Sequence, residues 1–328
     1  MTAAEILEAF PKLSVLVVGD ICLDRWCTYD PDVAEPSRET GIPRIGVVET
    51  EVTPGAGGTV ANNLAALGAG RVAVCGAVGR DGYAYELRAA LAARGIGAEL
   101  LVESPRIQTF TYTKLLNRRT GEEDLPRVDF INVEPLPAEA ERRILETVDE
   151  EAGGFDVLIV SDQAETSQGG VVTPAVRDLV AGLAERFPRQ VIWVDSRERP
   201  ELFRNVIVKP NEQEARAACR RLGIEEDFQA LRRRIGERPL VITRGADGAL
   251  VVDDAGERLV AGRRIEKPVD ICGAGDSFSA GAALTLAVTG SIDEAVRMGN
   301  LVASITIMKK GTGTASPEEL LQAVESLP

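Results

Sequence analysis

The sequence predicts an α/β protein with a doubly wound, mostly parallel sheet, helices on both faces of that sheet, and a small added β lid. Short β-branched apolar runs recur along the chain, helix-length segments separate most of them, and polar residues end the runs. Such runs are typical of strands buried on both faces, and their alternation with helices is typical of parallel sheets. Because the chain has 328 residues and is 45% hydrophobic, we expect residues 1–328 to form one domain.

The first apolar run, Ser14–Asp20, ends in a glycine and a carboxylate, as expected for a buried parallel strand. Five further runs share its character: Arg71–Val78, Phe155–Asp162, Gln190–Asp195, Asn205–Lys209 and Leu240–Thr243. Helices are expected between them at Gly82–Ala93, Thr173–Arg186 and Glu212–Leu222. Thr173 before Pro174 is a typical helix start, and the run from Ser316 to Glu319 predicts a capping box.

Residues 28–54 and 105–133 interrupt this alternation. They lack helical periodicity but contain short alternating runs at Gly46–Thr53 and Gln108–Leu116. We interpret them as antiparallel strands that form a lid over the sheet edge, the alternative being a pair of irregular surface insertions. Such a lid exposes a strand edge, so a homodimer formed through the lid is a further expectation.

Charge and composition exclude several classes of partner. The 37 basic and 51 acidic residues give a net charge of −14, which repels nucleic acid and anionic membranes. No apolar run approaches the ~20 residues of a membrane helix, and Glu5 and Glu8 stand where a signal peptide carries basic residues. We therefore expect a cytoplasmic protein that binds neither nucleic acid nor membranes.

The chain contains no histidine, which excludes Ser-His-Asp and Cys-His catalysis and histidine-ligated metals. Its five scattered cysteines include no C-x-x-C pair, so we interpret them as small buried hydrophobic residues. Acid–base chemistry is therefore left to carboxylates, lysine, tyrosine or cysteine.

The run from Asp270 to Gly281 places a glycine turn and a carboxylate where an apolar helix begins. Backbone N–H groups of Gly273, Ala274 and Gly275 could point at one anion, to which the helix dipole adds partial positive charge. Asp276 would lie beside that anion and could accept a proton from a hydroxyl that attacks a γ-phosphate. Taken alone, the run is equally well explained as a glycine-rich turn with an aspartate cap.

Polar residues follow the predicted strands, at the sheet edge where open α/β proteins bind ligands. They are Asp20 with Asp24, Asp162, Asp195, Asn211 with Glu214, and Thr243-Arg244-Gly245. One such residue is usually a cap or a turn, but the set predicts a site. The i, i+3 spacing of Asn211 and Glu214 would put both on one side of a helical turn, where a carboxylate can hold Mg²⁺ near phosphates, although this pattern alone is usually capping.

A second glycine cluster, from Gly55 to Ala65, opens a predicted helix. Gly57 and Gly58 would let a substrate approach the backbone, and Asn62 offers a donor and an acceptor to a polyol. A dinucleotide fingerprint would require glycine at Val60, so that reading fails, whereas a simple tight turn remains an alternative.

In this order the motifs resemble those of the ribokinase-like (PfkB) carbohydrate kinases over essentially the whole chain. The matching elements are G-G-x-x-A-N at Gly57–Asn62, N-x-x-E at Asn211–Glu214 and D-x-x-G-A-G-D at Asp270–Asp276. The resemblance implies that Asp276 is the catalytic base, that Gly273–Gly275 form the anion hole, and that Glu214 and Asn211 organise Mg²⁺.

The same resemblance assigns further residues to ligands. The resemblance implies that Asp24, Gly58 and Asn62 bind the sugar, and we add to this predicted substrate site Asp20, Gly57, Lys114, Arg127 and Asp162. It implies that Thr243, Gly245 and Asn300 lie along ATP, and we add to this predicted nucleotide site the strand-end residues Asp195 and Asn211. Asp270 and the segment Gly311–Thr314 are implied to shape a monovalent-cation site for K⁺, although Ile271 stands where the family commonly has threonine.

Within the family the chain is most similar to the D-glycero-D-manno-heptose 7-phosphate kinases, which phosphorylate the anomeric O1. The similarity lies in Val17–Asp24, Thr113-Lys114, Arg127–Phe130 and Ser161-Asp162. This chain departs from those kinases at two places. After the Ser-Asp pair they have Tyr-Ala-Lys-Gly, whereas this chain has Gln163-Ala164-Glu165-Thr166. Where they have Asp-Pro-Lys, this chain has Asp195-Ser196-Arg197. Glu165 would repel an acceptor phosphate, and the cations that could outweigh it are Lys114, Arg118, Arg127 and Arg197.

The expected function is Mg²⁺-dependent transfer of the γ-phosphate of ATP to a hydroxyl of a sugar or sugar phosphate, with heptose 7-phosphate as one candidate. The alternatives are a related kinase for ribose, fructose or a nucleoside, and a non-catalytic sugar- or nucleotide-binding protein. A nicotinamide-dependent oxidoreductase is disfavoured because Asp20 stands where the pyrophosphate-binding glycines should be.

Overall fold

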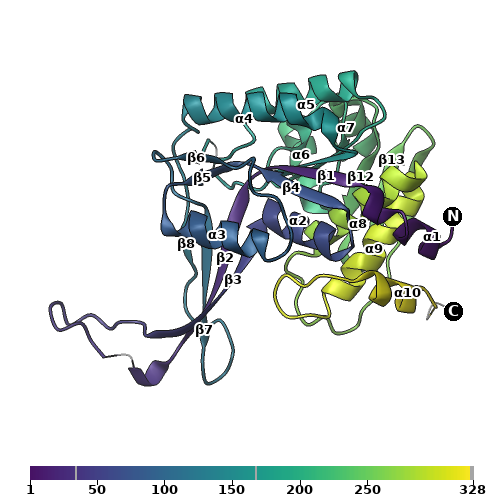
Figure 1. The fold of residues 1–328 in the computed structure, drawn as a ribbon. Coiled ribbons are helices and arrows are strands. Elements are labelled where there is room, and N and C mark those ends of the chain that lie inside the picture. Colours follow the sequence, from purple (N-terminus) through teal and green to yellow (C-terminus); the bar gives the residue numbers. More distant parts are fainter. Residues whose placement is uncertain (34, 167, 326–328) are drawn as a thin grey trace.

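The computed structural model describes residues 1–33, 35–166 and 168–325, and in these residues eight strands form a central sheet (Figure 1). In spatial order the strands are β14 (Gly256–Ala261), β13 (Gly248–Asp253), β12 (Leu240–Thr243), β11 (Ile207–Val208), β10 (Val191–Ser196), β9 (Val157–Asp162), β1 (Ser14–Gly19) and β4 (Arg71–Cys75). All pairings from β4 to β12 are parallel, and the two remaining pairings, β12 with β13 and β13 with β14, are antiparallel. The predicted mostly parallel sheet is confirmed.

Helices cover both faces of this sheet because its strands are apolar on both sides. Val15 and Val17 of β1 pack into one core, whereas Leu16 and Val18 pack into the other. The first core is closed by α1 (Ala3–Leu7), α2 (Gly57–Ala66), α3 (Gly82–Ala92), α8 (Ala274–Thr289), α9 (Ile292–Thr306) and α10 (Pro317–Glu325). The second is closed by α4 (Ala138–Glu151), α5 (Pro174–Arg186), α6 (Glu212–Leu222) and α7 (Phe228–Ile235).

The predicted helix starts are confirmed. The Thr173 hydroxyl accepts a hydrogen bond from the Val176 N–H, with Pro174 at the first helical position of α5. Ser316 and Glu319 exchange reciprocal hydrogen bonds at the start of α10, as a capping box requires.

A second sheet projects from the body as the lid (Figure 1). Its order is β3 (Val47–Ala56), β2 (Ile21–Tyr29), β7 (Thr111–Asn117) and β8 (Val128–Phe130), and a separate pair is formed by β5 (Ala77–Gly79) and β6 (Val102–Ser104). The outer pairings are antiparallel as expected, but the expectation is wrong for β2 and β7, which pair in parallel. A single residue, Asp20, separates the end of β1 from the start of β2.

The cysteines are all free, and four of them are buried as predicted. Cys272 contradicts that expectation, since it lies exposed in the glycine turn rather than in a core. Within the part of the chain that the structure describes, no helix has the length and apolar character needed to cross a bilayer.

Candidate active site

A cavity of about 160 Å³ lies between the root of the lid, the loops after β9 and β10, and the glycine turn before α8. It contains acidic, basic, aromatic and small side chains, which are Asp24, Arg25, Trp26, Ala56, Thr59, Tyr112, Lys114, Arg127, Gln163, Glu165, Arg197, Cys272, Gly273, Asp276 and Thr312. The structure therefore brings together the predicted residues Asp24, Lys114, Arg127, Gly273 and Asp276.

The glycine turn is formed by Gly273, whose φ of 77° lies in the left-handed region and which directly precedes α8. Asp276 is the third residue of α8, and Ser277 to Thr285 are buried, so the turn is anchored in the core. The first N–H groups of a helix have no carbonyl partner within it and carry partial positive charge. The start of α8 is therefore suited to an anion, as the sequence predicts.

Burial raises the pKa of the Asp276 carboxyl to about 7, and the negative charge of Asp195 adds to this effect. The positive charges of Lys209 and Arg197 act in the opposite direction. A carboxylate whose pKa lies near neutrality can both accept and return a proton at physiological pH. A carboxyl with this pKa at the edge of the cavity is suited to accept a proton.

Lys209, at the end of the strand segment that contains β11, is a site residue that the sequence analysis missed. Its Nζ lies 2.9 Å from Oδ2 of Asp195, and both side chains are buried. A Cβ built on Gly275 would lie 3.4 Å from Lys209 Nζ, so the ammonium group sits against the glycine turn. The sequence did contain a signal for Lys209, since this lysine ends the apolar run Asn205–Lys209. A lysine buried at the end of a strand needs an acidic partner.

Asn211 and Glu214 form a reciprocal capping box at the start of α6. The Asn211 N–H donates to Glu214 Oε2 at 2.7 Å, and the Glu214 N–H donates to Asn211 Oδ1 at 2.9 Å. Burial raises the pKa of the Glu214 carboxyl, and the nearby Asp195 charge adds to it. A divalent cation at this end of the site would relieve that concentration of negative charge.

The residues around Glu214 fit a Mg²⁺ ion that is held partly by substrate phosphates and water, rather than a metal ion that is held only by protein side chains. Among the described residues, no group of three or more Cys, His, Asp or Glu side chains is arranged to hold a metal ion. Magnesium in phosphoryl-transfer sites is usually held by one or two carboxylates together with substrate phosphates and water. The donor set around Glu214 suits that mode.

At the end of the cavity near the lid, alternate residues of two lid strands line the wall. Asp24 and Trp26 of β2 lie opposite Tyr112 and Lys114 of β7 in the parallel register. Lys114 Nζ lies 4.4 Å from the Trp26 ring centroid. Burial raises the pKa of the Asp24 carboxyl to about 6, and the Lys114 charge opposes this shift. The period of two along a strand was the signal that could have identified Trp26 and Tyr112.

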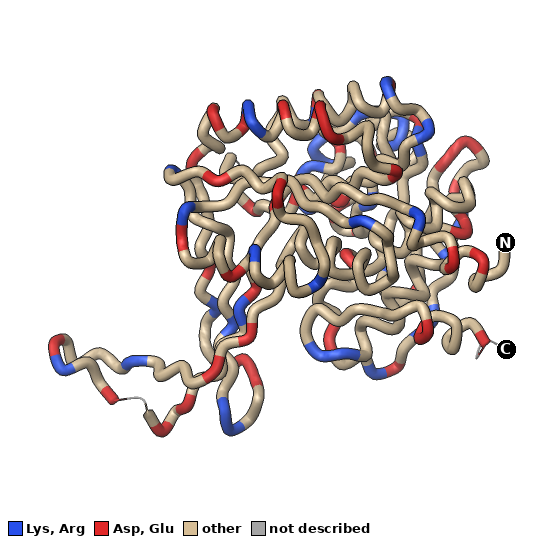
Figure 2. The backbone as a smooth tube through the Cα atoms, in the orientation of Figure 1, with Lys and Arg blue, Asp and Glu red and all other residues tan. Residues whose placement is uncertain are grey.

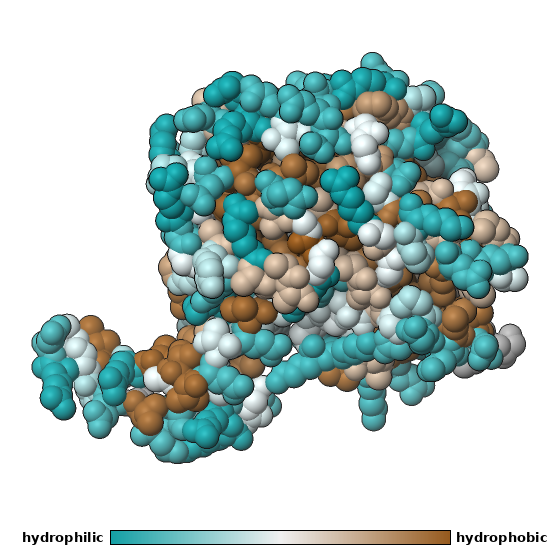
Figure 3. Space-filling model, viewed as in Figure 1, coloured by the Kyte–Doolittle hydropathy of each residue, from teal (hydrophilic) through white to brown (hydrophobic). Residues whose placement is uncertain are grey.

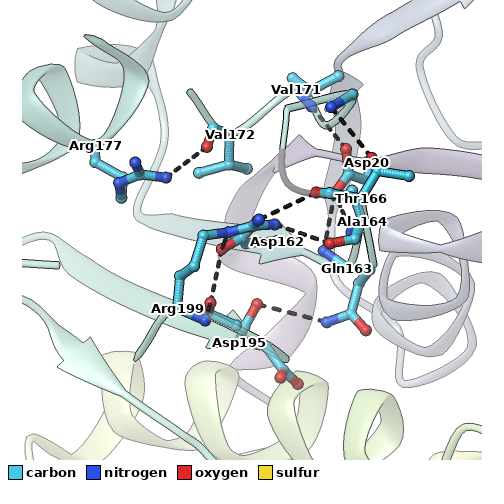
Figure 4. Close-up of polar contacts among 12 residues, drawn as sticks. Asp20, Asp162, Gln163, Ala164, Thr166, Val171, Val172, Arg177, Asp195 and Arg199 are labelled. Carbon is cyan, nitrogen blue, oxygen red and sulfur yellow. Dashed lines mark hydrogen bonds and ion pairs between the residues drawn. The ribbon is translucent and has the colours of Figure 1, made fainter. Parts of the chain in front are cut away.

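Asp20 and Asp162, which are predicted to bind the substrate, are buried, do not line the cavity, and are hydrogen-bonded to other groups of the protein (Figure 4). Asp20 accepts hydrogen bonds from the backbone N–H groups of Gln163, Ala164 and Val171 at 2.8 to 2.9 Å. Asp162 pairs with Arg199 at 2.9 Å and accepts the Ser196 hydroxyl at 2.6 Å. Both carboxylates therefore shape the loop after β9, which brings Gln163 and Glu165 to the cavity.

The other predicted residues are also placed by the fold. Gly57 and Gly58 begin α2 and pack against the β1–β2 junction and Pro54, and Asn62 lies on the same helix without lining the cavity. The Asn300 amide donates to the Val260 carbonyl at 3.1 Å and so ties α9 to β14.

Two further residues that are predicted to lie along ATP are found at the end of β12. Thr243 is the last residue of that strand and forms a bridge with Asn211, and Gly245 opens the turn that follows.

Asp270 accepts hydrogen bonds from the N–H groups of Cys272 and Gly311 at 2.9 and 3.1 Å, which joins the glycine turn to the Gly311–Thr314 segment. Arg118 pairs with Asp30 out on the lid and does not line the cavity.

Comparison with known proteins decides the family. A family model described as "pfkB family carbohydrate kinase" matches residues 12–319. The chain belongs to the pfkB family of carbohydrate kinases. It is an α/β carbohydrate kinase, and membership of this family implies ATP and a divalent metal as cosubstrate and cofactor.

Relatives within the pfkB family include the bifunctional protein HldE of Pelobacter propionicus, 32% identical over 97% of this chain and 64% of that protein. HldE of Caulobacter vibrioides is 31% identical over 98% of this chain and 66% of that protein. The chain therefore spans about two thirds of the length of these relatives.

Solved structures share the pfkB fold. Phosphofructokinase-2 from Escherichia coli in complex with potassium has a TM-score of 0.73 and 20% identity, covering 95% of this chain and 98% of that chain. Arabidopsis thaliana ribokinase complexed with ribose and ATP has a TM-score of 0.69 and 16% identity, covering 96% and 99%. At these identities the likeness concerns the fold.

Proposed function

We propose that this pfkB kinase transfers the γ-phosphate of ATP to a hydroxyl of a sugar bound between Asp24 and Asp276. The observation that supports it best is the Asp276 carboxyl, which lies in the cavity at the start of α8 and has a pKa raised to about 7. Asp24 lines the same cavity and could hold the acceptor, and the start of α8 could hold the phosphoryl group.

In this mechanism Asp276 removes the proton from the acceptor hydroxyl as that oxygen attacks the γ-phosphorus. The N–H groups of the glycine turn and the Lys209 ammonium group face the transferred phosphoryl group and stabilise the charge on its oxygens. Asp195 holds Lys209 in place through their buried ion pair. Mg²⁺ bound near Glu214 and Asn211 would neutralise phosphate charge.

The acceptor is tested with a panel of sugars and their phosphates that includes D-glycero-D-manno-heptose and its 7-phosphate, because the sequence resembles the heptose 7-phosphate kinases and HldE is among the relatives. We expect at least one member to accelerate release of ADP from ATP in the presence of Mg²⁺. Running the assay with K⁺ or Na⁺ as the only monovalent cation tests the role proposed for Asp270. If no sugar accelerates ADP release while ATP still binds, the protein is a binding protein on a kinase fold.

We further propose that the lid closes over the acceptor and excludes water, which would otherwise compete for the phosphoryl group. Hydrogen exchange in residues 28–54 and 105–133 should slow when the sugar binds, because closure buries their backbone. Exchange in α5, which packs on the far core, serves as the internal control. Unchanged exchange in both lid segments at saturating sugar would identify them as inert insertions.

A homodimer formed through the lid is also proposed. Apolar side chains gather on the projecting arm (Figure 3), and Ile42, Ile45, Val47 and Val48 are 65%, 48%, 45% and 49% exposed. A second copy would cover this surface and the free edge of β3. Val48→Lys should shift the mass measured by light scattering from two chains to one, whereas a monomeric wild-type protein would refute the proposal.

A further inference from the structure

The cations at the acceptor end of the cavity are all paired with carboxylates of the protein itself. Arg25 lies 3.1 Å from Glu86, Lys114 lies 3.8 Å from Glu123, and Arg127 lies 2.6 Å from Asp129. Acidic and basic residues accordingly alternate where the lid strands meet the body (Figure 2).

The fourth cation, Arg197, is held by Glu165. Its Nη1 lies 2.5 Å from Glu165 Oε1, and both residues line the cavity. Glu165 thus adds a negative charge to those of Asp24 and Asp276 and at the same time neutralises the nearest arginine. A phosphate group entering here would meet three carboxylates and no cation free of a carboxylate partner among the described lining residues.

Buried groups hold the backbone on both sides of Glu165, while the Arg197 and Glu165 side chains are 47% and 61% exposed to the cavity and solvent. Arg199 donates to both oxygens of Asp162 and to the carbonyls of Ala164 and Thr166, which flank Glu165 (Figure 4). The Asp20 carboxylate holds the same loop through the N–H groups of Gln163 and Ala164. The backbone on either side of Glu165 is therefore fixed, and its carboxylate is directed to Arg197.

We propose that the Glu165–Arg197 pair determines acceptor specificity, and that the acceptor is a sugar without a phosphate group at the end that meets this pair. The proposal rests on the proposed sugar kinase function and names its substrate class. A neutral polyol can exchange hydrogen bonds with both members of the pair, whereas a phosphate dianion binds Arg197 only by displacing Glu165 against charge repulsion.

The test compares each sugar with its own phosphate: ribose with ribose 5-phosphate, fructose with fructose 6-phosphate, and the heptose with heptose 7-phosphate. For the wild-type enzyme we expect kcat/KM to be higher for the unphosphorylated member of the pair that reacts. Glu165→Gln keeps the shape but frees Arg197, so the ratio should shift toward the phosphorylated member by roughly 10-fold or more. Glu103→Gln, which breaks a pair with Arg80 outside the cavity, is the matched control and should leave the ratio unchanged.

Binding of inorganic phosphate gives a second readout that does not depend on turnover. Trp26 lines the cavity and Trp193 is fully buried, so phosphate can be titrated by the change in intrinsic fluorescence. With ADP and Mg²⁺ bound, Glu165→Gln should bind phosphate roughly 10-fold more tightly than the wild-type and Glu103→Gln proteins.

Equal phosphate affinity in all three proteins would overturn the proposal, as would a wild-type preference for phosphorylated acceptors. A complete lack of ADP release with every sugar refutes the kinase function instead, and the phosphate titration then still decides the charge preference of the cavity.

Discussion

Asp276→Asn should lower kcat by at least ~10²-fold while the protein still folds and binds ATP. The amide has the size of the carboxyl but cannot accept the proton that the attacking hydroxyl releases. Steady-state kinetics with the acceptor found in the panel measures the loss, and calorimetric titration with ATP is the control for nucleotide binding. Near-normal turnover would show that another group removes the proton.

The pH dependence provides an independent check on the same residue. Because the pKa of Asp276 is raised to about 7, the base is protonated below that pH, so kcat/KM should rise as pH increases through about 7. Between pH 4 and 7 the folded protein binds more protons at Asp276 than the unfolded chain, so the contribution of this group to stability falls as pH rises. Asp276→Asn should therefore be more stable than the wild type at pH 8, as measured by denaturant unfolding.

Lys209→Met should lower both turnover and the free energy of unfolding. Removing the ammonium group leaves Asp195 buried without its cation, and breaking a buried ion pair in this way costs about 3–5 kcal/mol. Urea unfolding followed by circular dichroism measures this change. The phosphoryl group would also lose the cation that lies against the glycine turn.

The double variant Lys209→Met, Asp195→Asn separates the two effects. Neutralising Asp195 removes the unpaired charge, so much of the lost stability should return. Turnover should stay low because the Lys209 ammonium group is still missing from its place against the glycine turn. Recovery of turnover together with stability would show that Lys209 acts only by supporting the fold.

The mostly parallel character of the central sheet could be predicted because most of its strands are separate apolar runs in the sequence, whereas the antiparallel strands β13 and β14 were not predicted. Continuous apolar runs such as Ser14–Asp20, separated by capped helices, allow few arrangements other than a parallel sheet. The glycine turn before Asp276 could also be predicted from the sequence, because a short, contiguous segment is enough to place a carboxylate at a helix start.

Contacts between segments that are far apart in the sequence could not be predicted in the same way. Asp20 and Asp162 carry the same local signal as Asp24, a carboxylate after a strand, yet the backbone N–H groups and the arginine that occupy them come from other segments. The pairing of Glu165 with Arg197 likewise joins residues 32 positions apart. A sequence pattern shows that a charge is present but not which partner neutralises it.

The junction between β1 and β2 fixes the root of the lid. Gly19 has a φ of 133°, a Cβ there would come within 2.1 Å of the Ser161 carbonyl oxygen, and the Asp20 N–H donates to that same oxygen at 3.0 Å. The lid is therefore held at one end, by Gly19 and Asp20, so its displacement during the proposed closure would increase with distance from Asp20. Asp24, four residues further along the chain, would hardly move, whereas the tip of the arm would move far. If the lid closes as proposed, a sugar could contact Asp24 before closure, so that binding of the acceptor and its enclosure would be separate steps.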